Sequence, residues 1–309
     1  MTSRDARHVV TSIGAVAIAL AIGVTPARGQ SGLEGVIEQY GATSIKGYIQ
    51  PLADVLVANL SLGYLNSAPP KKGGISFSIE AVAMTAALDE SLRQYTANTP
   101  AGFQPATFTT STIFGGTASA VTHSSIPGLS YRGSDGLVDA EYFPTAAPQL
   151  RLGGILGTEV VVRYASSTMV PFIEEEDFPD LTLMGFGLQH SLNRYFTTLP
   201  LEVSIGGSYN SLKFGDIVDL SSTSFGVNAG KSFGIIGLSA GIASEGGTMN
   251  LAYTSTDPTA PGAVNIDLDV SRSIRFRAGG ALNLGPLKLF GDAAFGNVTS
   301  YAGGIRFGF

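Results

Sequence analysis

The chain alternates between apolar and polar residues over much of its length. Residues 73–85 place an apolar side chain at every second position, and the same pattern recurs between Leu150 and Phe309. A period of two is typical of β-strands, whose successive side chains point to opposite faces of the sheet. The later alternating segments are residues 150–156, 159–164, 183–189, 201–210, 224–229, 236–242, 249–253, 273–279, 287–295 and 300–309. Gly-containing turns are predicted at residues 245–247, 284–286 and 296–297. We therefore predict an all-β protein of about 12 strands, within a range of about 10–14.

Two stretches depart from this period. Between residues 30 and 58 apolar residues recur three and four positions apart, as in Ile45, Tyr48 and Ile49, which predicts a short N-terminal helical segment acting as a plug or cap. Residues 86–148 are rich in Thr, Ser, Ala, Pro and Gly without a sustained period. They are predicted to form a long irregular insertion in a barrel domain that spans residues 59–309.

The first 29 residues have the features of a secretory signal peptide in the usual order. Arg4 and Arg7 precede an apolar run over residues 9–24, and Ala27 and Gly29 supply small residues for cleavage. We expect an exported protein that is cleaved near Gly29. The alternative is an N-terminal membrane anchor, which the broken apolar run and the small residues disfavour.

Composition indicates that the predicted sheet lies in a membrane. Only 14% of residues are charged and mean hydropathy is +0.24, yet no run of 18 apolar residues follows the signal region. Strands of about ten residues, tilted by about 40°, span about 25 Å, the height of the apolar band of an outer membrane. Because lipid offers no hydrogen bonds, only a closed sheet pairs every strand. We predict an antiparallel transmembrane β-barrel in a Gram-negative outer membrane, with outer-membrane lipid and the barrel assembly machinery as partners.

The polar face of the predicted strands carries few charges, and these are of both signs. Their position in the alternation places them in the lumen, since an arginine facing lipid at mid-depth costs about 2–4 kcal/mol. The predicted lumen-facing charges are Glu80, Arg151, Glu159, Arg163, Glu202, Arg275, Arg277, Lys288, Asp292 and Arg306. Arg272 instead shares the parity of Ile274, which places it beyond the bilayer or next to a β-bulge. The charges either line a selective pore or form a structural ion-pair network that fills a narrow barrel.

No pattern in the sequence requires an enzyme, a metal or a cofactor. His190 and Ser191 are adjacent, so they point to opposite faces of a strand and cannot pair there. The acidic cluster at 174–177, with Asp180 nearby, is interpreted as a solvated loop rather than a divalent-cation site. The chain lacks cysteine, which excludes disulfides and thiolate zinc sites. Its net charge of −6 disfavours a nucleic-acid partner.

The C-terminus resembles the assembly signal of outer-membrane barrels. Gly304, Phe307 and the terminal Phe309 match its glycine–aromatic–aromatic spacing. In addition, residues 45–77 and 183–192 resemble an exported family with predicted barrels, which is distantly similar to the long-chain fatty-acid outer-membrane transporters. This resemblance covers most of the mature chain and implies an outer-membrane barrel with a transport function.

The first function hypothesis is a passive channel or transporter for small or hydrophobic solutes. The rival hypothesis is a structural or adhesive barrel without a pore, and a third class, a lipid hydrolase, has little support. Counting back from a periplasmic C-terminus over about 12 strands puts residues 86–148 in the periplasm, although long loops are normally extracellular. The number of strands therefore decides on which side the insertion lies.

Overall fold

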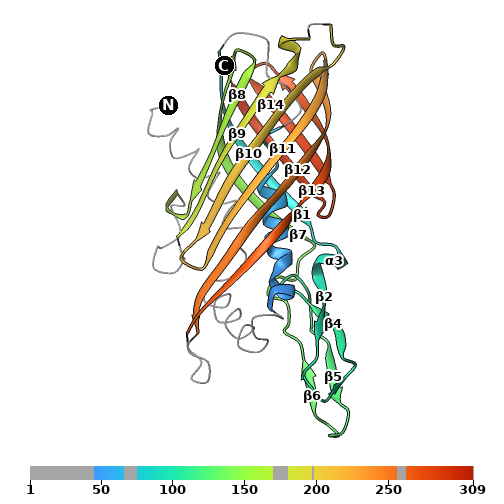
Figure 1. The fold of residues 1–309 in the computed structure, drawn as a ribbon. Helices are drawn as coiled ribbons and strands as arrows, with labels where there is room; N and C mark the ends of the chain where they lie inside the picture. Colours follow the sequence, from blue (N-terminus) through green and yellow to red (C-terminus); the bar gives the residue numbers. More distant parts are fainter. Residues whose placement is uncertain (1–44, 66–74, 170–179, 197, 256–261, 309) are drawn as a thin grey trace.

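The computed structural model describes residues 45–65, 75–169, 180–196, 198–255 and 262–308. Ten strands form one closed antiparallel barrel (Figure 1). Around the barrel the order is β1 (Ser76–Ala87), β15 (Ser300–Gly308), β14 (Leu287–Phe295), β13 (Gly262–Leu284), β12 (Ile236–Ser255), β11 (Val218–Phe233), β10 (Glu202–Phe214), β9 (Leu181–Ser191), β8 (Thr158–Ser166) and β7 (Tyr142–Ile155). The predicted antiparallel barrel is confirmed, with ten strands where the alternation suggested about 12.

One long strand replaces two predicted ones. β12 continues for 20 residues through the turn predicted at 245–247, so that prediction is wrong. A β-bulge occurs there instead, where Glu245 pairs with Ser273 but Gly247 pairs with Val270. A Cβ on Gly247 would lie 2.3 Å from the Ser221 carbonyl oxygen, so glycine marks a close approach between strands here and not a turn. The turns predicted at 284–286 and 296–297 do connect β13 to β14 and β14 to β15.

Residues 88–141 leave the barrel between β1 and β7 and form a projecting arm (Figure 1). The arm has α3 (Glu90–Arg93), a sheet of β2 (Gln94–Asn98) and β4 (Thr107–Ser111), and a sheet of β3 (Phe103–Gln104), β5 (Ala120–His123) and β6 (Ser130–Arg132). Ala97, Phe108 and Val121 form its own small core. The irregular insertion predicted for 86–148 is thus shorter and ordered, because strands of two to five residues are too short to show a period.

The arm and the C-terminal strand end lie at opposite ends of the barrel. Ser78 near the start of β1 pairs with Gly308, while the arm begins after Ala87, where β1 finishes. The count over about 12 strands put the insertion at the C-terminal end and is wrong. It assumed an extra turn inside β12, which made two strands of one between the insertion and the C-terminus.

An apolar belt surrounds the barrel between the bulge and the C-terminal end. In this belt, large exposed apolar side chains from all ten strands face outward. They include Phe77, Ile79, Leu150, Leu152, Val162, Phe186, Leu188, Tyr209, Phe225, Leu238, Ile242, Ile274, Phe276, Leu289, Ile305 and Phe307. The same strands turn buried polar and charged side chains inward, among them Glu80, Arg163 and Arg275. Membrane barrels have this inverted arrangement, whereas soluble barrels place polar residues outside.

Toward the arm end β10–β13 extend beyond the apolar belt, and there the polarity reverses. In this lower region Leu220, Met249 and Leu268 are buried on the inner side, in the main apolar core. Thr248 and Asp267 are exposed on the outer side. The inner side is apolar here because it packs on a helix and on the base of the arm.

The inner helix, residues 45–60, enters the barrel from the arm end, and residues 61–65 follow it as a turn (Figure 1). Every residue from Val55 to Leu60 is buried, which is typical of a helix enclosed on every side, whereas Lys46 near the start of the helix is exposed. The Tyr48 hydroxyl donates to the Asp135 carbonyl at 2.9 Å, which links the helix to the arm. Among the described residues, no helix combines the length and apolar character required to cross a membrane. The signal segment 1–29 and the first part of the predicted helical segment, 30–44, lie outside the described residues.

Candidate functional site

The inner helix ends inside the barrel with carbonyl groups that need partners. The last four carbonyls of any α-helix lack intrahelical donors and carry partial negative charge. The Ser61 amide donates to the Val57 carbonyl at 3.2 Å, which satisfies one of them. Arginine side chains of the barrel wall donate to six further carbonyls at the helix end and in the following turn. These carbonyls belong to Ala58, Leu60, Ser61, Leu62, Gly63 and Tyr64.

Arg163 and Arg151 hold the helix end from one side of the lumen. Arg163 on β8 is fully buried and donates to the Leu60 carbonyl at 3.0 Å and to the Leu62 carbonyl at 2.7 Å. Its guanidinium also stacks on the ring of Tyr64, 4.3 Å from the centroid. Arg151 on β7 donates to the Gly63 carbonyl at 3.1 Å. Because β7 and β8 are neighbours in the sheet, the two guanidiniums act on consecutive parts of the same turn.

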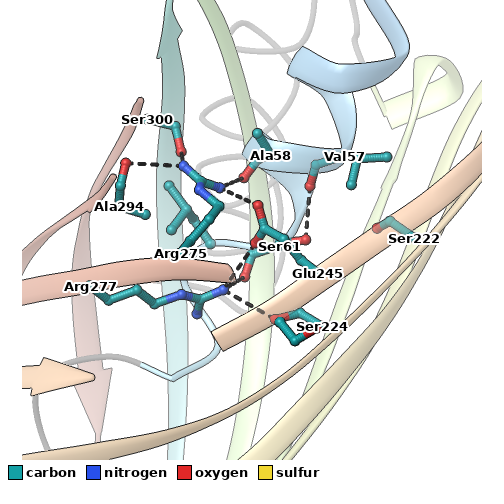
Figure 2. Close-up of polar contacts among 12 residues, drawn as sticks. Val57, Ala58, Ser61, Ser222, Ser224, Glu245, Arg275, Arg277, Ala294 and Ser300 are labelled. Carbon is teal, nitrogen blue, oxygen red and sulfur yellow. Dashed lines mark hydrogen bonds and ion pairs between the residues drawn. The ribbon is translucent and has the colours of Figure 1, made fainter. Parts of the chain in front are cut away.

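Arg275 and Arg277 hold the helix end from β13, as Figure 2 shows. Arg275 donates to the Ala58 carbonyl at 3.2 Å, and Arg277 donates to the Ser61 carbonyl at 3.2 Å. Both pair with Glu245 of β12, at 2.5 Å from Arg275 and 3.4 Å from Arg277. We call Arg151, Arg163, Arg275 and Arg277 the arginine clamp.

Carboxylates on the lumen face balance the clamp. Arg151 pairs with Glu80 at 2.9 Å and with Glu159 at 2.5 Å, and Arg306 also pairs with Glu80. The Gln149 amide donates to Glu80, and its oxygen accepts from Arg163 at 3.1 Å. Each of these groups is buried or nearly so, which makes the bonds mutually dependent in a medium of low dielectric constant.

The clamp makes the position of the inner helix specific. Removing one partner of a buried ion pair typically costs about 3–5 kcal/mol of folding stability. Replacing the whole pair by well-packed apolar residues is often neutral, so such a pair contributes specificity more than stability. The arrangement therefore fixes the helix end at one place, and the helix cannot leave without uncovering several buried charges. With its side chains a helix is about 10–12 Å wide, so it occupies the middle of a ten-stranded lumen.

Nine of the ten charges predicted for the lumen face inward in the structure. Glu202 is the exception: it keeps the inward parity of Ser204, but it is the first residue of β10 and lies exposed at the rim. Glu245, which pairs with two clamp arginines, was assigned to a turn and so was missed. Glu245 stands at the same parity as Ala243 and Met249, which are both buried on the inner face. This shared parity was the feature of the sequence that could have identified Glu245 as a lumen residue.

Lys288 and Asp292 lie on the lumen face of β14, the strand that pairs with β13 of the clamp. Neither forms an ion pair with another described residue, and one oxygen of Asp292 has no hydrogen-bond partner there. With Glu245 included, ten charged residues face the inside of the barrel. Eight of them belong to the bonded network around the helix end, and the other two are Lys288 and Asp292. Unpaired charges in a lumen require hydration or protonation to be tolerated.

The other residues singled out in the sequence fall into three places. Arg272 is exposed beside the bulge, as predicted, and donates to the Thr223 hydroxyl at 2.6 Å. Of the C-terminal signal, Phe307 points outward into the belt and Gly304 contacts Phe290, while Phe309 lies outside the described residues. His190 contacts the Thr158 hydroxyl at 2.9 Å and Tyr195 at 3.2 Å, whereas Ser191 is buried on the opposite face. The acidic cluster 174–177 also lies outside the described residues.

Comparisons with known proteins give one family and several solved barrels. Residues 8–309 match a family described as a family of unknown function (DUF6588). The search of curated proteins gives no match. The chain is similar to the attachment invasion locus protein Ail of Yersinia pestis in complex with the heparin analogue sucrose octasulfate, with 9% identity, 77% of this chain and 99% of that chain covered, and a TM-score of 0.25.

Two further similarities involve other solved outer-membrane proteins. A loop-deletion mutant of OmpT, an outer membrane protein of Vibrio cholerae, shares 10% identity over 77% of this chain and 100% of that chain, with a TM-score of 0.28. A mutant of the porin of Rh. blastica shares 11% identity over 76% of this chain and 100% of that chain, with a TM-score of 0.22.

Proposed function

The chain belongs to the family of unknown function DUF6588, and we propose that it is an outer-membrane β-barrel closed by its own inner helix, which anchors the arm at the cell surface. The observation that carries this proposal is the arginine clamp. Four wall arginines bond the end of the inner helix in the middle of the lumen. Of the two leading hypotheses from the sequence, a barrel without a standing pore accounts for this geometry better than a passive channel.

The apolar belt supports the location. Side chains such as Leu238, Phe276 and Ile305 are more than half exposed on the outer face. Leaving so many large apolar residues in contact with water is unfavourable, at about 25 cal/mol per Å² of apolar surface. A bilayer removes that cost, and the closed sheet leaves no unpaired strand in lipid. Outer-membrane lipid and the assembly machinery, through Gly304, Phe307 and Phe309, are the partners we propose for the barrel itself.

The lengths of the connections support the orientation. At the C-terminal end β11–β12 and β13–β14 are joined by two-residue turns, while the arm projects from the other end. Outer-membrane barrels have short periplasmic turns and longer extracellular loops. We therefore place the C-terminal end in the periplasm and the arm outside the cell.

Single-cysteine labelling tests this proposal, since the native chain has no cysteine. Ser130→Cys places a thiol on an exposed position of the arm, and Ser232→Cys places one at the exposed C-terminal end. We expect a membrane-impermeant maleimide on intact cells to label Ser130→Cys, and to label Ser232→Cys only after permeabilisation. Equal labelling of both in a soluble fraction, or the reverse order, contradicts the proposal.

A second candidate, a gated channel for small or hydrophobic solutes, is favoured by one observation. The helix end is held by polar bonds, and Lys288 and Asp292 face the lumen without ion pairs to described residues. A plug held by polar bonds can exchange them for water when it moves, whereas a packed apolar plug cannot. Under this candidate, conductance appears only when the clamp is weakened. We propose no catalytic role, because His190 and Ser191 do not meet.

A further inference from the structure

β13 has an open edge along its lower part. β14 pairs with β13 only from Phe276 to Leu284, so residues 265–273 of β13 have β12 on one side and no described strand on the other. Such an edge presents every second N–H and C=O to its surroundings, ready to pair with another chain. The Gln50 side chain donates to one of these carbonyls, that of Asp269, at 3.2 Å.

A cavity of about 320 Å³ runs along this open edge. Asp269, Ser271 and Ser273 of β13 line one side, Gln50 and Asp54 of the inner helix line another, and Val298 after β14 closes it toward the belt. The cavity begins just beyond Ile274, the first outward apolar residue of β13 in the belt. It is therefore outside the lipid band, where an extended segment of a water-soluble partner can reach it.

The charges that face the open edge are acidic: Arg272 instead reaches across β12 to the Thr223 hydroxyl of β11, and Arg275 pairs with Glu245. Asp54, Asp267 and Asp269 form no ion pair with any other described residue, and Glu245 is neutralised by the clamp. Asp267 and Asp269 both lie on the outer face, two residues apart. In an added strand, residues two apart would stand beside them on the same face. Lysine or arginine at those two positions of the added strand would complement the negative charges of Asp267 and Asp269.

We propose that the open edge of β13 binds an extended, basic peptide segment of a partner protein, which adds a strand to the sheet. Backbone hydrogen bonds to residues 265–270 provide the pairing, and the basic side chains face Asp267 and Asp269 on the outer side. Six residues of strand span about 20 Å, enough to pair with a peptide of six or seven residues. The opposing interpretation is that the two aspartates only protect the edge from pairing, as charged residues often do.

Peptide binding to the full chain in detergent tests the proposal. The probe is a labelled heptapeptide in which lysine alternates with valine, measured by fluorescence anisotropy. Two further peptides of the same sequence carry N-methyl groups on alternate backbone amides, one in each register, and a fourth has glutamate for lysine. We expect the lysine peptide to bind, one N-methylated peptide to lose binding by tenfold or more, and the glutamate peptide not to bind.

Protein variants separate edge pairing from general attraction to an acidic chain. The double variant Asp267→Asn with Asp269→Asn should weaken binding roughly fivefold to tenfold, as expected for two partly exposed ion pairs. Asp216→Asn, which removes an exposed charge on the turn before β11, should leave binding unchanged. Slower hydrogen exchange of the amides in 265–270 on peptide addition would locate the new strand.

Three results would overturn the proposal. No binding of the lysine peptide means that the edge is protected. Equal binding of both N-methylated peptides means that no strand is added, and an equal effect of Asp216→Asn means that attraction is not local. None of these outcomes depends on whether the barrel conducts or on which side of the membrane the arm lies, so the proposed function is judged separately.

Discussion

The two parts of β13 have opposite polarity although they belong to one strand. In the belt Ile274, Phe276 and Leu282 point outward and Arg275 points inward. In the lower region Ile266 and Leu268 point inward, and Asp267 points outward. In sequence the large apolar residues of β13 all occupy even positions, so one stripe, interrupted at Arg272, changes from the inside of the barrel to its outside.

The bulge produces this change. Gly246 of β12 opposes both Ser271 and Arg272 of β13, and one extra residue in a strand moves every later side chain to the other face. Each part thereby directs its apolar side chains toward an apolar medium. In the belt that medium is outside, and in the lower region it is the inner helix and the arm base. Alternation thus specifies a strand, while the surroundings of each part decide which face is apolar.

Deleting Ser271 should have the largest effect, because it removes the extra residue. Either Asp267 and Asp269 would then enter the apolar core, or Arg275 and Arg277 would face lipid at about 2–4 kcal/mol each. Both costs approach the whole stability of a typical domain. We expect little or no heat-modifiable barrel on gels after refolding, whereas deletion of Gly128 at the arm tip should refold normally. Equal yields from the two deletions would contradict the role of the bulge.

Two arginines on either side of the parity change allow a finer comparison. Arg275→Met removes a clamp residue and leaves Glu245 buried with a weaker partner, which should destabilise the barrel by about 3–5 kcal/mol. Arg272→Met removes an exposed arginine, and its effect should stay within about 0.5 kcal/mol. Urea unfolding in lipid vesicles measures both. Similar losses for the two variants would mean that Arg275 is not held as described.

Lysine substitutions on the outer face of β12 map the boundary of the belt. Ala240 and Thr248 are both exposed on that face, one within the belt and one in the lower region. Ala240→Lys should cost about 2–4 kcal/mol if it lies near the bilayer midplane, and Thr248→Lys close to zero. The same unfolding assay applies. A costly Thr248→Lys would place the lower region in lipid and remove the contrast between the two parts.

The smallest expected effect concerns Asp54 on the inner helix in the lower region. Burial raises the pKa of this carboxyl above its ordinary value, opposed by the hydrogen bond from Gln50. A raised pKa means that the folded state favours the neutral carboxyl. The contribution of Asp54 to the free energy of unfolding is therefore largest at low pH and is lost as pH rises through the folded-state pKa. Asp54→Asn should therefore be slightly more stable than the native chain at pH 7, with the gain vanishing near pH 3. A native chain that is more stable than Asp54→Asn at pH 7 would contradict this.

The sequence was sufficient for the barrel and for most of the lumen charges. Every membrane-spanning strand needs an outer face almost free of charge, so the period-two alternation identifies the inner face. Arg163, Arg275 and Arg306 were therefore assigned to the correct side. The strand count was less certain because a glycine pair can mark a turn or a close approach. Gly246 and Gly247 mark the latter, which also concealed Glu245.

The clamp could not have been predicted from the sequence. Its acceptors are the backbone carbonyls of residue 58 and residues 60–64, and nothing in a local pattern identifies which distant arginine will reach them. The helical spacing of Ile45, Tyr48 and Ile49 indicates a helix but not that a barrel encloses it. The arginines meet at the helix end only because the sheet closes, which brings β7, β8 and β13 around one axis.

Single-channel conductance in planar lipid bilayers tests the central claim, that the clamped inner helix closes the barrel. Purified, heat-modifiable native protein should insert without producing stable open-channel steps. Arg163→Ala, which loses the bonds to the Leu60 and Leu62 carbonyls, should show brief openings. Arg132→Ala, which removes an exposed ion pair of the arm, should be as silent as the native chain. Stable conductance of the native protein, unchanged in Arg163→Ala, would show that the lumen is open and would contradict the account.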